Sequence, residues 1–137
     1  MTLFQRTPQL NISNSEQLRE TIHDYFHSTF NRYEQLFETL ACDEAYYKKP
    51  ISLRHPLIFY LGHTATFFIN KLILAGLISE RINPAFESMF AVGVDEMSWD
   101  DLSDSHYQRP TVQAAKDHRQ HVRTVVNNII SHTPLTT

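Results

Sequence analysis

The stretch LRHPLIFYLGHTATFFINKLILAGLI, residues 53–78, decides the fold class of this 137-residue chain. Almost every position in it is apolar or aromatic. Pro56 suits the first turn of a helix, because a missing N–H group costs little there, and Gly76 suits the end of one. The stretch therefore predicts a helix over residues 56–76. Because this helix is apolar nearly all round, we expect it to be buried.

The same stretch is long enough, at about 20 residues, to cross a lipid bilayer. It also contains His63, Asn70 and Lys71, and polar side chains inside a bilayer are costly. A buried helix of a soluble bundle is therefore the better interpretation, and we expect no membrane association.

The composition predicts a single helical domain over residues 1–137. Apolar residues make up 42% of the chain, glycine is scarce at 3 residues, and no strict alternation of apolar and polar residues persists. The net charge of −3 and the scattered basic residues argue against nucleic-acid binding. The one cysteine, Cys42, allows no disulfide within the chain, and the N-terminus lacks a signal-peptide pattern, so we expect a cytoplasmic protein.

Two further long helices are predicted. The sequence Ser-Asn-Ser-Glu, starting at residue 13, is a capping-box pattern, so a helix should run over residues 13–41 after an extended lead-in at residues 1–12. A third helix is expected over residues 111–131, where apolar residues recur at three- and four-residue steps. Between the second and third helices, residues 79–109 show no clear period and are expected to form a long irregular loop.

Three main helices fall short of the four that an antiparallel bundle normally has. The prediction is therefore an all-α, up-down bundle that is incomplete. Its open face should expose apolar side chains, which usually mark association, so we expect a homo-oligomer or a complementary domain to cover it.

His63 is the most informative of the eight histidines. On a helix, Tyr60, Phe67 and Asn70 would neighbour it in a largely apolar environment, which disfavours the charged imidazolium. A neutral imidazole is the form that binds a metal. Gly62 would let a backbone segment or a ligand approach closely. The alternative to a metal ligand is a core histidine bonded to a neighbouring helix.

The other histidines give weaker patterns. His118 and His121 lie three residues apart and, with His63, could in principle form a three-histidine site. His23 and His27 have a spacing that can chelate a metal, but they lie at the edge of the apolar face or off it, so we interpret them as a solvated pair. Three histidines in loops or at helix ends carry no pattern: His55, His106 and His132. The carboxylates of GVDEMSWDDL do not have calcium-loop spacing.

Three segments between residues 24 and 101 carry a family resemblance: DYFHSTFNRYEQLFE, KPISLRHPLIFYLGHTATFFINKLILAGLI and RINPAFESMFAVGVDEMSWDDL. They strongly resemble the N-terminal part of the 5-histidylcysteine sulfoxide synthases, the non-haem iron enzymes of ovothiol biosynthesis. The resemblance implies a DinB-like helical bundle. It also implies an oxidoreductase that joins cysteine to histidine using dioxygen.

In that family three histidines bind Fe(II), and the resemblance implies that His63, in the HTATFF position, is one of them. Tyr60, Phe67 and Asn70 would then surround a metal ligand. The family's other two ligands come from an H-x-x-x-H-x-E motif on a later helix, which is absent after Thr111. The catalytic domain that completes the substrate site is also absent, so we expect the chain to be inactive alone.

Three hypotheses remain open. The chain is the N-terminal part of a sulfoxide synthase that needs a complementary C-terminal domain, or it is a non-catalytic helical module that self-associates. The third hypothesis is a small DinB-type metal-dependent thiol transferase or hydrolase that uses His63, His118 and His121. The roles of the residues in the GVDEMSWDD loop are not assigned.

Overall fold

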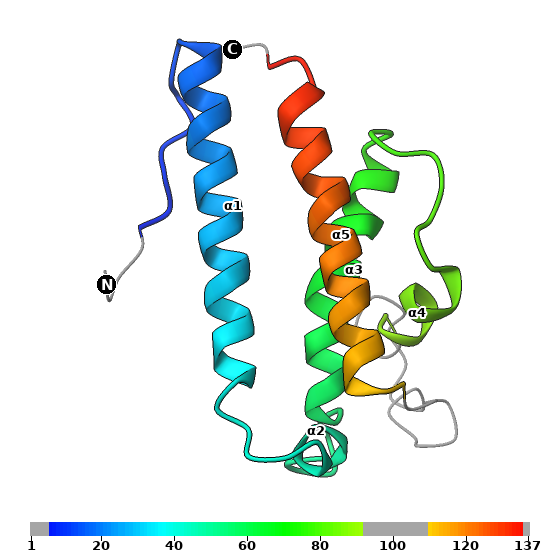
Figure 1. Ribbon diagram of the computed structural model, residues 1–137. Coiled ribbons are helices and arrows are strands. Elements are labelled where there is room, and N and C mark those ends of the chain that lie inside the picture. Colours follow the sequence, from blue (N-terminus) through cyan, green and yellow to red (C-terminus); the bar gives the residue numbers. More distant parts are fainter. Residues whose placement is uncertain (1–5, 92–109, 136–137) are drawn as a thin grey trace.

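The structure, a computed structural model, describes residues 6–91 and 110–135, and these residues form five helices and no strand (Figure 1). Three helices are long: α1 (Ser15–Phe37), α3 (Leu57–Leu74) and α5 (Val112–His132). Two are short: α2 (Glu44–Tyr47) and α4 (Pro84–Met89). The all-α class with three main helices is confirmed. The GVDEMSWDD loop and His106 lie outside the described residues.

The three long helices stand side by side with their axes roughly aligned (Figure 1). α1 runs antiparallel to α3, whereas α3 and α5 run in the same direction. The chain after α3 turns back beside it and places α4 near the end where α3 begins. This return connection is what allows α5 to start again at that end, so the order is not a simple alternation of up and down.

Both ends of α1 differ from the prediction. Asn14 is the N-cap, and its Oδ1 accepts a hydrogen bond from the backbone N–H of Gln17 at 3.0 Å. An asparagine satisfies this free N–H group as well as a serine does, so Ser13 stays outside the helix. At the other end, a turn closes with a hydrogen bond from Leu40 N–H to the carbonyl of Phe37. The four-residue helix α2 follows and is too short to give a periodic pattern.

The predicted end of α3 is confirmed at Gly76. This glycine has a φ angle of 73°, a left-handed conformation that costs it little. Its N–H group bonds to the carbonyl of Ile73, and the N–H of Leu77 bonds to the carbonyl of Leu72. This pair of bonds is the Schellman motif, and it satisfies carbonyls that the helix itself leaves free.

The expectation that α3 is buried nearly all round is wrong. One face is buried, but Phe67 is 43% exposed and Leu74 is 81% exposed. The exposed positions of α3 are Phe67, Lys71 and Leu74, which form one stripe along its second half that the described helices leave uncovered. By length and composition α3 could also cross a membrane. A single helix of this kind is weak evidence, because core helices of soluble proteins meet the same criterion.

Two apolar clusters hold the bundle together. The lower core joins α1, α2, α3, the turn after α4 and α5 at the end where α3 begins, and the upper core joins α1, α3 and α5 further along. The lower core consists of Phe37, Tyr46, Ile58, Phe59, Leu61, Phe90, Val112 and Ala115. The upper core consists of Phe26, Phe30, Ala65, Ile69, Val122 and Val126.

Helix α4 lies inside the segment that was expected to be irregular. Asn83 is its N-cap and accepts a hydrogen bond from Phe86 N–H at 3.1 Å. The Glu87 carboxylate is buried, accepts a hydrogen bond from Asn83 N–H and pairs with Arg81 at 3.2 Å. The Asn-Pro dipeptide at residues 83–84 was the signal for this helix start, because asparagine caps and proline suits the first turn. Six residues were too few for a visible period.

A buried arginine links the three long helices. Arg119 is 1% exposed and lies among the buried residues of α5. Its Nε donates to the Glu34 carboxylate at 3.2 Å, and its NH1 group donates to the Leu61 carbonyl at 2.9 Å and to Thr64 Oγ1 at 2.6 Å. The guanidinium also lies 4.1 Å from the centroid of the Phe30 ring. Partners on α1 and α3 thus compensate for burying its charge.

Candidate functional site

His63 is half-buried on α3, and its Nδ1 lies 2.7 Å from the carbonyl oxygen of Phe90. A carbonyl oxygen only accepts hydrogen bonds, so Nδ1 must carry the proton in this contact. In the neutral imidazole, Nε2 then has a free lone pair. Histidines that bind metals usually have this arrangement, in which the second ring nitrogen donates to a carbonyl or a carboxylate. The geometry therefore fits a ligand that binds through Nε2.

Gly62 makes the approach of Phe90 possible. A Cβ atom added at Gly62 would lie 2.4 Å from the Phe90 ring, a distance that real Cβ atoms do not tolerate. A close approach at this glycine is therefore present, but the approaching group is an aromatic side chain and not the backbone segment or ligand that was expected. The His63 imidazole also stacks on the Phe59 ring, with centroids 5.4 Å apart and an interplanar angle of 8°.

Two of the residues expected around His63 have clear positions. The Phe67 ring contacts the imidazole edge-on, with centroids 6.5 Å apart. Tyr60 turns its polar groups elsewhere, since its hydroxyl accepts a hydrogen bond from the His55 N–H at 3.3 Å and its carbonyl accepts one from the Tyr33 hydroxyl at 3.0 Å. Phe67 therefore contributes to the wall beside His63. The role of either residue around a metal ligand stays a prediction.

Asn70, the third residue expected around His63, is engaged at the next turn of α3. Its Oδ1 accepts a hydrogen bond from Arg81 at 2.7 Å, and the same arginine pairs with the buried Glu87. Asn70 therefore helps to hold α4 and the residues before it against α3. Any part that it plays near His63 stays a prediction.

His118, on α5, packs against the Phe90 ring. It is 5% exposed, and its Nε2 lies 3.1 Å from Thr66 Oγ1. Its ring stacks on the Phe90 ring with centroids 6.1 Å apart, and its Nδ1 has no hydrogen-bond partner within residues 6–91 and 110–135. Burial, together with the charges of His121 and Arg119, lowers the pKa of His118 to about 4. His118 is therefore neutral near pH 7.

A three-histidine site is not assembled in the part of the chain that the structure describes. No group of three or more His, Cys, Asp or Glu side chains is placed there to hold a metal ion. His118 packs under Phe90, and His121, one turn further along α5, is exposed. Metal binding by His63, His118 or His121 stays a prediction.

The pair formed by His23 and His27 lies partly at a helix interface. The Nδ1 of His23 is 3.0 Å from the carboxylate of Asp24. The Nε2 of His27 is 2.9 Å from Oδ1 of Asn127 on α5 and is part-buried. The interpretation of a solvated pair is therefore wrong for His27. The helical pattern placed His27 off the apolar face, but α5 also contacts α1 there through the polar side chain of Asn127.

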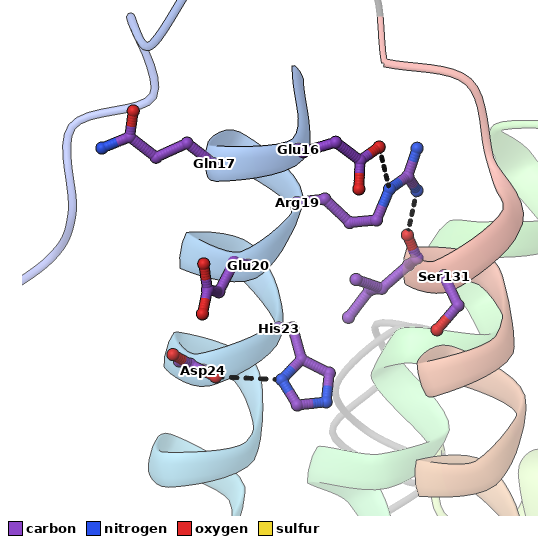
Figure 2. Close-up of a pocket in the computed structure, with 8 residues that line it drawn as sticks. Glu16, Gln17, Arg19, Glu20, His23, Asp24 and Ser131 are labelled. Atoms are coloured by element: carbon purple, nitrogen blue, oxygen red, sulfur yellow. Dashed lines mark hydrogen bonds and ion pairs between the residues drawn. The ribbon is translucent and has the colours of Figure 1, made fainter. Parts of the chain in front are cut away.

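His23 lines a polar pocket between the start of α1 and the end of α5 (Figure 2). The volume of this pocket is about 540 Å³. Its lining residues come from these two helices: Glu16, Gln17, Arg19, Glu20, His23, Asp24, Ile130 and Ser131. Arg19 crosses the pocket and donates hydrogen bonds to the carbonyls of Ile130 and Thr133.

His55 gave no signal in the sequence but is buried. It is 3% exposed, and its ring stacks on Phe59 with centroids 3.7 Å apart. Phe59 therefore lies between two imidazoles, those of His55 and His63. His132, at the end of α5, contacts the carbonyl of Asn128 at 2.9 Å and is exposed.

Comparison with known proteins places these helices in a family. The family model for the DinB superfamily matches residues 25–136, which include most of α1 and all of α3 and α5. No curated protein matches the chain significantly. The helical architecture agrees with the DinB fold, and the superfamily includes metal-dependent enzymes. The chain belongs to the DinB superfamily.

Proposed function

We propose that this chain is the helical N-terminal part of a non-haem iron sulfoxide synthase of the 5-histidylcysteine type. In this proposal, His63 is one of the iron ligands. The observation that carries it is the hydrogen bond from His63 Nδ1 to the Phe90 carbonyl, which leaves the Nε2 lone pair available. The sequence resemblance over residues 24–101 and membership of a superfamily that includes metal-dependent enzymes support it.

The described residues fit one ligand of an iron site and not a complete one. His63 would bind Fe(II) through Nε2, and the rings of Phe59 and Phe67 would limit the access of water to that nitrogen. The remaining ligands would come from outside the described residues. A site with three protein ligands would leave coordination positions open for a thiolate and for dioxygen. When bound, iron would supply the oxidative chemistry between these two substrates.

The substrates in this proposal are cysteine, histidine and dioxygen, and the product is a histidylcysteine sulfoxide. A complementary C-terminal domain would complete the substrate site, so the chain alone should show no turnover. The uncovered side of α3 fits such a partner, because Phe67 and Leu74 are exposed on the helix that carries His63.

The test combines this chain with the C-terminal region of a 5-histidylcysteine sulfoxide synthase, by mixing or by fusion. Sulfoxide formation from cysteine and histidine is then measured with His63→Ala beside the wild type and His132→Ala as the exposed-histidine control. We expect turnover only in the combined protein, lost with His63→Ala and kept with His132→Ala. Full turnover with His63→Ala would exclude this histidine as a ligand.

An anaerobic Fe(II) titration of the chain alone separates the proposal from the small-metalloenzyme hypothesis. We expect weak binding, because a lone imidazole lacks the gain in effective concentration that several ligands on one scaffold give. Tight one-to-one binding that is lost in His63→Ala and in His118→Ala would contradict the proposal. It would favour a rearranged site of the thiol-transferase or hydrolase kind.

A second candidate function is a non-catalytic module that self-associates through α3. The exposure of Phe67 and of Leu74 favours it, since apolar side chains on one helix face usually mark an interface. Sedimentation of the metal-free chain tests it, with Leu74→Asp as the disrupting variant and Leu36→Asp, at an exposed leucine of α1, as the control. A metal-free dimer that only Leu74→Asp dissociates would support this candidate.

A further inference from the structure

The turn that ends α4 contacts α3 through both the backbone and the side chain of Phe90. The Phe90 N–H group closes α4 on the carbonyl of Phe86, so the residue is fixed at the helix end. Its ring, 0% exposed, covers Gly62, and its carbonyl accepts the proton of His63 Nδ1. One residue therefore occupies the space above Gly62 and bonds to the neighbouring histidine.

We infer that Phe90 is a positioning residue that sets the tautomer of His63, and that its ring must rest on Gly62 to do so. The tautomer part of this inference stands on the contacts alone. Its consequence for metal binding rests on the proposed function, because it concerns the nitrogen that would bind iron.

The hydrogen bond to the Phe90 carbonyl reverses the usual preference of a neutral histidine for which ring nitrogen carries the proton. A neutral histidine side chain in water favours the proton on Nε2, which would place the lone pair on Nδ1. Since the carbonyl of Phe90 can only accept, it selects the form with the proton on Nδ1. The choice of nitrogen for a metal is set by the bond that the other nitrogen makes.

The ring cannot easily move away from Gly62. Three of its atoms, Cε2, Cζ and Cδ2, lie 2.4–2.5 Å from the position of an added Cβ. Behind it, His118 stacks at a centroid distance of 6.1 Å, and Phe86 packs at 5.7 Å. A methyl group at residue 62 would therefore displace Phe90, and its carbonyl with it.

The test is ¹⁵N NMR of the metal-free, ¹⁵N-labelled full chain at about pH 8.5, where imidazole is neutral. The protonated and lone-pair nitrogens of a neutral ring have well-separated shifts. We expect His63 to carry its proton on Nδ1 in the wild type and mainly on Nε2 in Gly62→Ala. The matched control is Gly76→Ala, the same change at a left-handed position with no side chain within 4 Å, which should leave the tautomer unchanged.

Phe90→Ala keeps the test decisive if Gly62→Ala fails to fold. Phe90→Ala removes the ring that rests on Gly62 and should also shift the proton toward Nε2. Adding Gly62→Ala to it should have little further effect, because the Cβ then has room. A wild-type proton on Nε2, or a tautomer that neither substitution changes, would overturn the inference.

Fe(II) titration of His63 in the same spectra separates this inference from the proposed function. We expect Gly62→Ala to weaken the effect of Fe(II) on His63 by roughly tenfold, the lower end of what the loss of such a partner costs. Because a lone imidazole binds weakly, the titration continues to Fe(II) concentrations that saturate free imidazole. If the His63 signals of the wild type stay unchanged even there, His63 is not available to the metal and the proposed function fails. The assignment of Phe90 as the residue that sets the tautomer would still stand on the metal-free spectra.

Discussion

The two ends of the bundle hold their histidines in different ways. At the lower core, Nδ1 of His63 bonds to the backbone carbonyl of Phe90, and the Phe90 side chain that fixes this carbonyl is 0% exposed. At the other end, the partner of His23 is the Asp24 carboxylate, and the two side chains are 45% and 71% exposed (Figure 2). An exposed pair exchanges readily with water, whereas a packed carbonyl cannot turn away. A defined lone pair therefore depends more on what fixes the other nitrogen than on histidine spacing.

The same contrast applies to the arginines that join α1 and α5. Arg119 on α5 is buried and reaches Glu34 on α1, while its other nitrogen bonds to α3. Arg19 on α1 crosses the polar pocket, with its side chain 21% exposed, and bonds to carbonyls at the end of α5. Both link the same two helices, but only one does so out of contact with water.

The largest expected effect is therefore at Arg119. In Arg119→Met, the Leu61 carbonyl and Thr64 hydroxyl lose a buried donor, while Glu34, 36% exposed, can regain water. We expect a loss of about 3 kcal/mol in the free energy of unfolding, the lower end for breaking a buried charge pair. Urea denaturation at neutral pH measures it.

The control is Lys116→Met, an exposed position on the same helix, where the change should stay within about 0.5 kcal/mol. A loss below about 1 kcal/mol in Arg119→Met would show that the apolar cores alone hold the three helices together.

The second effect is a pH dependence at His118. Its pKa in the folded state is about 4, lowered mainly by burial, against 6.5 for the ordinary side chain. Between these values the unfolded state binds a proton that the folded state does not, so stability falls as pH falls from 6.5 to about 4. The difference is on the order of 2–3 kcal/mol, since one unit corresponds to about 1.4 kcal/mol.

Urea denaturation at a series of pH values measures this loss. His118→Gln is the matched variant, because an amide can still bond to Thr66 but does not titrate in this range. We expect a flatter pH profile in His118→Gln. Identical profiles in the two proteins would assign the pH dependence to other groups.

Much of the fold could be predicted from periodicity and end signals. The long apolar run predicted α3, and the left-handed Gly76 was its predicted end. The two short helices α2 and α4 could not be predicted from a period, because four and six residues are too few to show one. The full burial of α3 was predicted wrongly, because the pattern records apolar faces and not how many neighbours cover them.

The site was less predictable than the fold. Gly62 signalled a close approach, but nothing in the local pattern named Phe90, which is 28 positions further along the chain. The contact depends on how the connection after α3 returns, and that is a long-range property. The contact of His118 with Thr66, which buries it beside α3, likewise depends on how the two helices pack.

The smallest expected effect is at the polar end, and it sharpens the contrast with Arg119. In Arg19→Gln, the last carbonyls of α5 lose a positively charged donor. Because Arg19 is partly exposed, water can replace it, so we expect a loss of about 1 kcal/mol in the free energy of unfolding. Faster hydrogen exchange of the amides in the last turn of α5 should accompany the loss, while α3 stays protected.

Glu16→Gln isolates the other contact of Arg19. The carboxylate lies 3.7 Å from Arg19 Nε, and its side chain is 83% exposed, so its removal should cost less than about 0.5 kcal/mol. A loss in the free energy of unfolding for Arg19→Gln as large as that for Arg119→Met would contradict the contrast between the exposed and the buried arginine. Solvent exposure would then not decide the strength of these links, and the polar pocket would hold α1 and α5 together as firmly as the buried arginine does.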